Sequence, residues 1–214
     1  MYIPASFAQS DMNVLHDFIE RHSFATLVSR HDDEPLASHL PLLLERRSGS
    51  RGTLIGHLAR ANPQWRQADG QQVLAIFSGP HAYISPGWYP DKEEAARVPT
   101  WNYAVAHLRG TLETFDDEAA LAGVVDGLSI EHEAGVGGDW RFEFDRDDHR
   151  RQLRGIVGFR FVADEIALKF KLSQNHPIAN REAVASRLQA QSREASRDTA
   201  ALMRERMTDE STGD

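Results

Sequence analysis

Aromatic rings and hydrogen-bond donors are concentrated between Leu54 and Tyr103. Three of the four tryptophans lie there, in the segments GHLARANPQW, GPHAYISPGWYP and VPTWNY. A planar conjugated ligand needs apolar and aromatic walls, whereas a phosphate on the same ligand needs cations, hydroxyls or free backbone N–H groups. This stretch supplies both, so it is a candidate site for a planar phosphorylated ligand. The alternative is that the tryptophans are core or interface residues and the prolines shape surface loops.

The segment ARANP predicts a phosphate-binding junction between a strand and a helix. Asn62 can cap a short helix that has Pro63 at its first position. The start of a helix carries unpaired backbone N–H groups and the positive end of the helix dipole, which together favour an anion. Arg60 would add a forked cation suited to phosphate oxygens. The alternative is an exposed arginine beside a capped helix.

Composition sets limits on the class of protein. The chain has 214 residues and a net charge of -8. It contains no cysteine, which excludes disulfides, thiolate catalysis and cysteine-type zinc sites. The N-terminus lacks a signal-peptide pattern and the apolar run LPLLL is too short to cross a bilayer, so we expect a cytoplasmic protein without membrane segments. The acidic balance disfavours nucleic-acid binding. A local basic face or a symmetric dimer would still permit it.

The hydrophobic pattern predicts a mainly β fold with surrounding helices, mostly antiparallel because strands follow one another along the chain. A helix is expected from Ser10 or Asp11 to Arg21, and another from Asp116 or Asp117. The runs FATLVS and LASHLPLLLE predict a hairpin with Pro41 at a sheet edge. Further strands are expected at TLIGHL, QVLAIFSG and YAVAHLRGTLETF.

Three later segments carry more detailed expectations. Residues 80–99 are predicted to form a long irregular excursion. The run IVGFRFVADEIALKFKL predicts two strands joined by a tight turn at Asp164-Glu165, with Lys169 and Lys171 facing solvent. Asn180 is predicted to cap one final helix that runs to Met207.

Common catalytic motifs are absent from the sequence. It contains no H-E-x-x-H, G-x-S-x-G or P-loop pattern, and GVGG lacks the dinucleotide-binding spacing. HDD and DRDDH are interpreted as turn and surface segments, so no metal site is assigned. His57, His81 and His107 could each donate a proton, although such histidines are more often structural. No catalytic residue is therefore assigned, and enzymatic activity stays open.

Six ordered segments resemble one known family. MYIPASF, SHLPLLL, GHLARANPQW, GPHAYISPGWY, VPTWNY and KLSQN are similar to those of the PaiB-like, FMN-binding negative transcriptional regulators. That resemblance implies the FMN-binding split β-barrel shared with pyridoxamine phosphate oxidases. It also implies a homodimer with FMN bound in clefts between the two barrels. DNA is a further partner implied by the family name, although the net charge does not support it.

The resemblance also implies a set of cofactor-binding residues. Arg60 and Lys171 would bind the phosphate, Lys171 on the resemblance alone. Trp101 and Tyr103 would form a wall of the flavin ring site or part of the dimer interface. The positions that match the family motifs are Ser38, His39, His57, Arg60, Asn62, Trp101, Asn102, Tyr103, Lys171, Ser173, Gln174 and Asn175.

Domain organisation and function follow as expectations. Residues 1–176 would form the split-barrel flavin domain, and residues 177–214 a C-terminal helix with a flexible tail. The first functional hypothesis is an FMN-binding repressor of transcription. The alternatives are a flavin-dependent oxidoreductase acting on a small molecule, because a fold does not fix a function, and a dimeric small-ligand sensor without catalysis.

Overall fold

The computed structural model describes residues 1–212, with side chains through Asp209, so the end of the predicted flexible tail lies outside the described residues. None of the described helices has the length and apolarity needed to cross a bilayer. The strands are β1 (Ala8–Gln9), β2 (Phe24–His31), β3 (Glu34–Pro41), β4 (Leu43–Glu45), β5 (Thr53–Ala59), β6 (Gln72–Ile84), β7 (Thr100–Phe115) and β8 (Ile156–Lys171). The helices are α1 (Met12–Arg21), α2 (Gln64–Ala68), α3 (Glu118–Val136), α4 (Asp147–Leu153), α5 (Ile178–Gln189) and α6 (Glu194–Thr212), with 3-10 turns η1 (Ala5–Phe7) and η2 (Pro86–Trp88).

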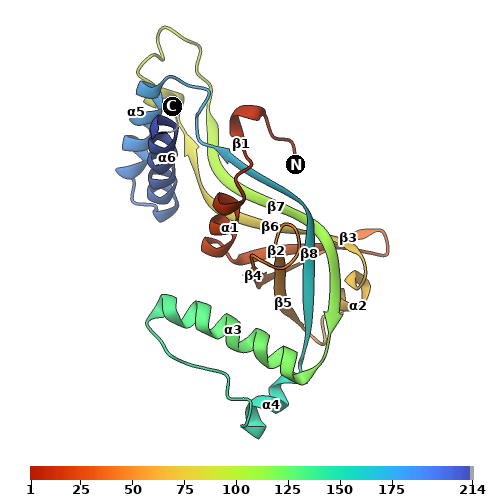
Figure 1. Ribbon diagram of the computed structural model, residues 1–214. Helices are drawn as coiled ribbons and strands as arrows, with labels where there is room; N and C mark the ends of the chain where they lie inside the picture. The colour runs from red at the N-terminus through yellow and green to blue at the C-terminus, as the bar shows by residue number, and fades with distance from the viewer. Residues whose placement is uncertain (213–214) are drawn as a thin grey trace. The chain divides into compact units, whose positions relative to one another are not determined.

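One sheet contains all of these strands. Its order is β3-β2-β6-β7-β8-β5-β4, and β1 pairs with β8. The strand pairs with a defined register are antiparallel. Figure 1 shows β7 and β8 as long neighbouring strands, with α5 and α6 as a helical pair at the C-terminal end of the chain. The predicted class is therefore confirmed: a mostly antiparallel split-barrel β fold with surrounding helices and a C-terminal helical segment.

The chain forms two compact units, and each is assembled from separate segments. The larger unit consists of Asp11–Phe77 and Ala106–Ala167. The smaller unit consists of Met1–Ser10, Ser78–Val105 and the chain from Leu168. Three of the boundaries fall inside β6, β7 and β8, so each of these strands contributes residues to both units.

Helix α1 forms where the sequence predicts it. The Asp11 side chain accepts a hydrogen bond from the Asn13 backbone N–H at 2.8 Å, which satisfies one of the free donors at the helix start. Leu15, Phe18 and Ile19 share one face and are buried. Capping and amphipathic spacing therefore both define this helix.

The β2–β3 hairpin is also confirmed. Asp32 and Asp33 adopt positive φ angles of 45° and 69°, which suit a tight two-residue turn between twisted strands. The register runs from His31 opposite Glu34 to Phe24 opposite Pro41. Strand β3 lies at a sheet edge, where the missing N–H of a proline costs no ladder hydrogen bond.

Each unit has its own apolar core. A fully buried leucine or phenylalanine side chain stabilises the folded state by about 1.5–3 kcal/mol relative to exposure, before conformational entropy is counted. In the larger unit the side chains without exposed surface include Leu27, Leu54, Phe77, Leu108, Leu112, Phe159 and Phe161. In the smaller unit they include Ile84, Val184, Leu188 and Ala200.

Strand β6 is longer than predicted. It continues to Ile84, so the irregular segment begins at Ser85 and not at residue 80. Ala82 and Ile84 are buried, while His81 and Tyr83 are exposed. This alternation is typical of a half-buried strand.

Strand β8 runs without interruption from Ile156 to Lys171, so the predicted turn at Asp164-Glu165 is wrong. A tight two-residue hairpin turn needs positive φ angles, and neither of these residues has one. The Asp164 carboxylate instead accepts a hydrogen bond from Gln72 Nε2 at 2.8 Å.

The C-terminal segment forms two helices, which corrects the predicted single helix capped by Asn180. Asn180 lies buried inside α5, and its Nδ2 donates to Asp91 Oδ1 at 2.9 Å. Between α5 and α6, one Arg197 nitrogen donates to the carbonyl oxygens of Gln191 and Ser192 at 3.2 and 2.7 Å. These contacts stabilise a break that helical periodicity alone does not reveal.

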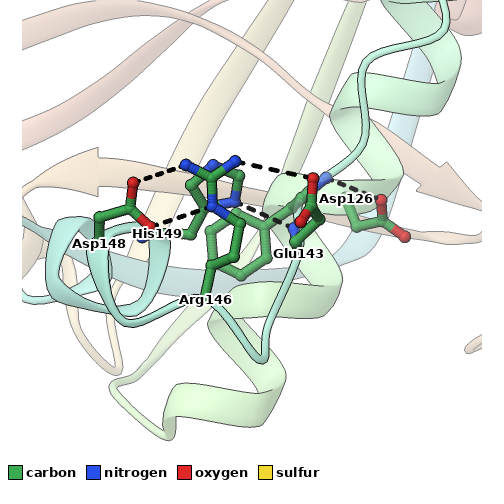
Figure 2. Close-up of polar contacts among 6 residues, drawn as sticks. Asp126, Glu143, Arg146, Asp148 and His149 are labelled. Atoms are coloured by element: carbon green, nitrogen blue, oxygen red, sulfur yellow. Dashed lines mark hydrogen bonds and ion pairs between the residues drawn. The ribbon is translucent and has the colours of Figure 1, made fainter.

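Polar contacts hold the connection between α3 and α4 (Figure 2). The Glu143 backbone N–H donates to His149 Nδ1 at 3.1 Å, and Asp126 accepts a backbone N–H from the same connection. Arg146 pairs with Asp148 at 2.6 Å, and this hydrogen-bonded pair lowers the pKa of Asp148 to about 2. The DRDDH segment, predicted as a surface turn, therefore leads into α4 and carries two of these contacts.

Candidate functional site

The predicted cofactor residues are divided between the two units. Ser38, His39, His57, Arg60 and Asn62 belong to the larger unit. The other seven belong to the smaller unit: Trp101, Asn102, Tyr103, Lys171, Ser173, Gln174 and Asn175. Each group is described separately below.

In the larger unit, β3 and the chain after β5 bring two predicted residues together. Asn62 Nδ2 donates to Ser38 Oγ at 2.9 Å. Asn62 Oδ1 accepts from the Gln64 backbone N–H at 3.0 Å, so this donor at the start of α2 is already used. The helix begins one residue later than predicted, with Pro63 at the N-cap position. His39 Nδ1 lies 3.0 Å from Thr26 Oγ1 on the neighbouring strand β2.

His57 presents an unsatisfied polar atom. It lies on β5 opposite Gly158 of β8, and its Nδ1 is buried without a hydrogen-bond partner among the described residues. Burial lowers the pKa of His57 below its usual value because the charged imidazolium loses hydration. The neutral ring therefore retains one buried nitrogen that a polar ligand group could contact.

Arg60 has partners that the sequence does not reveal. Its Nε donates to the Arg154 carbonyl at 2.9 Å, and one terminal nitrogen donates to the Ile156 carbonyl at 3.0 Å. Its backbone N–H also donates to the Gly155 carbonyl at 2.8 Å. A guanidinium group has five N–H donors, so three remain for a ligand. Arg60 thus fixes the start of β8, and its predicted phosphate contact stays a prediction.

In the smaller unit, two lysines at the end of β8 correct the prediction that both face solvent. Lys169 is only 8% exposed, and its ammonium group lies 5.2 Å from the centroid of the Tyr103 ring. Lys171 Nζ donates to Thr100 Oγ1 at 2.5 Å and to the Trp101 carbonyl at 2.6 Å. Burial, with the nearby charge of Lys169, lowers the pKa of Lys171.

These two cations form a candidate anion site. Among the side chains described, through Asp209, neither lysine contacts a carboxylate. An ammonium group has three donors, so Lys171 retains one. Two neighbouring cations without an acidic partner favour an anion such as phosphate. Lys169 Nζ donates to the Tyr2 carbonyl oxygen at 3.3 Å. The sequence did not reveal this role of Lys169, because Tyr2 lies at the opposite end of the chain.

Three of the other predicted residues mainly stabilise the end of β8. Asn102 and Ser173 are buried and exchange hydrogen bonds at 3.1 Å through their side chains. Gln174 accepts from the Leu172 backbone N–H at 2.7 Å and donates to the Phe170 carbonyl at 2.6 Å. Their direct contact with a cofactor therefore stays a prediction, as it does for the exposed Asn175.

An open hollow beside Trp101 offers an aromatic surface within the smaller unit. Its volume is about 340 Å³. Trp101 is 50% exposed, and Tyr83 lies edge-on to it at 6.0 Å between ring centroids. The face of the indole is therefore not covered by a stacked ring of the described chain. The lining residues are Ser78, Gly79, His81, Trp101, Tyr103, Ala104 and Val105.

Solved structures with the same fold define the class. The chain matches the flavocytochrome Anf3 from Azotobacter vinelandii with a TM-score of 0.59 and 15% identity, over 77% of this chain and 69% of that chain. It matches the FAD and heme binding protein from Mycobacterium smegmatis with a TM-score of 0.59 and 17% identity, over 84% and 79% of the two chains. At such identities the likeness establishes the fold alone. That fold is the one seen in these flavin-associated structures.

Sequence comparisons identify the family. Residues 1–165 match the family described as "Putative FMN-binding domain". The chain is 32% identical over 220 residues to "Protease synthase and sporulation protein PAI 2" of Bacillus subtilis, covering 97% of this chain and 98% of the relative. The protein belongs to this PaiB-like FMN-binding family. The predicted family is confirmed, and FMN is confirmed as the cofactor that the family description names.

Proposed function

We propose that the protein is a homodimeric, FMN-binding negative regulator of transcription. The observation that carries this proposal is the similarity to PAI 2, which extends over almost the full length of both chains. The printed name of PAI 2 refers to protease synthase and sporulation. The exposed aromatic hollow supports a flavin as the bound ligand, as do Lys169 and Lys171, which contact no carboxylate among the described side chains.

The chemistry of FMN fits the groups of this chain. Its phosphate needs cations, and Arg60 and Lys171 each retain unused N–H donors. Its planar ring needs an aromatic surface, which Trp101 and Tyr103 supply. His57 Nδ1, buried and unsatisfied among the described residues, could contact a polar edge of the cofactor. When bound, FMN supplies reversible electron transfer.

The first experiment measures FMN binding. The purified protein is titrated with FMN and followed by flavin absorption, alongside Arg60→Ala and Lys171→Ala. We expect each substitution to weaken binding about tenfold or more, because a charge-assisted hydrogen bond to phosphate is lost. Arg47→Ala and Lys92→Ala are matched controls, because both side chains are exposed and lie outside the proposed site. Failure of the wild-type protein to take up FMN would overturn the proposal.

A second experiment separates the regulator from the flavin-dependent oxidoreductase. The FMN-loaded protein is mixed with NADPH, and in parallel with genomic DNA fragments at increasing salt. Selective DNA binding that weakens with salt supports the regulator, because cations that contact phosphates release counterions. Rapid bleaching of the flavin by NADPH without selective DNA binding would replace the regulator with the oxidoreductase.

A further inference from the structure

A second hollow lies within the smaller unit and shares His81 and Trp101 with the hollow beside Trp101. Its volume is about 240 Å³, and it is more enclosed than the hollow beside Trp101. Aromatic rings of β6, η2 and β7 line it, together with the connection between α5 and α6 and the first turn of α6. The lining residues are His81, Ala82, Tyr83, Trp88, Trp101, Gln191, Arg193, Ala195 and Ser196.

The aromatic side of this hollow leaves ring surfaces available. The His81 and Trp101 rings are tilted by 39° with centroids 6.2 Å apart, and Tyr83 meets Trp101 edge-on. Tyr83 and Trp101 are 46% and 50% exposed. Aromatic rings gain further stabilisation from an offset or edge-to-face partner. A small planar ring is therefore a suitable ligand for this side.

The lining also includes a cation, the exposed Arg193. Arg193 precedes α6, in the connection that Arg197 holds through the Gln191 and Ser192 carbonyls. Within the described part of the chain the Arg193 side chain has no hydrogen bond or ion pair, although acidic residues outnumber basic ones by 32 to 24. A guanidinium fork matches the two oxygens of a carboxylate.

We propose that this hollow binds a small aromatic carboxylate. The ring would contact Trp88 and Trp101, and the carboxylate would pair with Arg193. The volume falls below the usual range for drug-sized ligands, which begins at about 300 Å³, so a single-ring acid is the appropriate size. This inference names a ligand class for a hollow to which the proposed function assigns no ligand, although Trp101 borders both hollows.

The test is a titration of the full-length protein with benzoate, followed by ligand-observed NMR, with and without added FMN. Benzamide is the uncharged counterpart. We expect benzoate to bind with a Kd on the order of 0.1–1 mM, within the limits for so few atoms, and benzamide to bind at least about tenfold more weakly. Arg193→Ala and Trp88→Ala should each weaken benzoate binding by about tenfold or more.

The controls distinguish a specific site from general charge or misfolding. Arg187→Ala removes an exposed arginine of α5 that does not line the hollow, and should leave binding unchanged. Arg193→Lys should restore part of the affinity, because it keeps the charge but loses the fork. Circular dichroism checks the fold of each variant. Absence of benzoate binding to the wild type, or equal binding by Arg193→Ala, would overturn the inference whether or not FMN binds.

Discussion

The half-buried ring of His57 links protonation to stability. Because burial lowers its pKa in the folded state, the unfolded chain takes up the proton first as the pH falls below about 6.5. The contribution of neutral His57 to the free energy of unfolding is therefore complete above that pH. It is lost as the pH falls toward the lowered pKa of the folded state. Substitution His57→Gln should reduce this pH dependence.

Urea unfolding at about pH 8 and about pH 5.5 measures the effect. Some pH dependence should remain, because burial also lowers the pKa values of His107 and His176. His132→Gln serves as the control, since this ring is exposed on α3. A variant His57→Gln with the same pH dependence as the wild type would contradict the expectation.

Single residues also explain why the site could be predicted only in part. The motif KLSQN located Lys171, but the burial of Lys169 depends on its contacts with Tyr2 and Tyr103, which are distant in sequence. Arg60 was predicted as a ligand cation from its local segment. Its contacts with the carbonyls of Arg154 and Ile156 arise only when the sheet forms.

At the scale of elements, the close approach of β7 and β8 depends on a glycine. A Cβ atom at Gly110 would lie 2.0 Å from the Val162 carbonyl oxygen, far inside contact distance. Because both partners are backbone within a sheet, neither can move aside cheaply. Substitution Gly110→Ala should lower the free energy of unfolding by about 2–4 kcal/mol.

The matched control is Gly123→Ala in the middle of α3. Nothing lies within 4 Å of a Cβ atom built there, so only helix propensity changes. This substitution should stabilise the protein by up to about 1 kcal/mol. Denaturant unfolding of both variants provides the comparison, and equal effects at the two glycines would refute the steric argument.

Local sequence pattern predicts some of the helices and strands correctly and misses others. Helix α1 and the β2–β3 hairpin were predicted because capping, spacing and turn chemistry lie within a few residues. The continuity of β8 was missed because Asp164 and Glu165 resemble turn residues when read alone. The break between α5 and α6 was missed because Arg197 stabilises it from the following helix.

At the scale of the whole molecule, the proposed homodimer predicts the mass of the assembly in solution. Phe24, Val98 and Trp101 are 66%, 71% and 50% exposed in the single chain. Single exposed apolar side chains are normal on a protein surface, so only the mass of the assembly shows whether a dimer covers them. The proposed homodimer should give a mass of about twice 24.0 kDa by light scattering. A dilution series with and without FMN tests this, and a constant monomer mass with FMN bound would reject the dimer.

The assembly of each unit from separate segments has a consequence for how such a protein can change over time. Because β6, β7 and β8 each cross from one unit to the other, neither unit corresponds to one uninterrupted stretch of the gene. Recombination therefore cannot exchange or delete one unit as a module. Members of such a lineage should diversify through loop insertions and point substitutions, with both units inherited together.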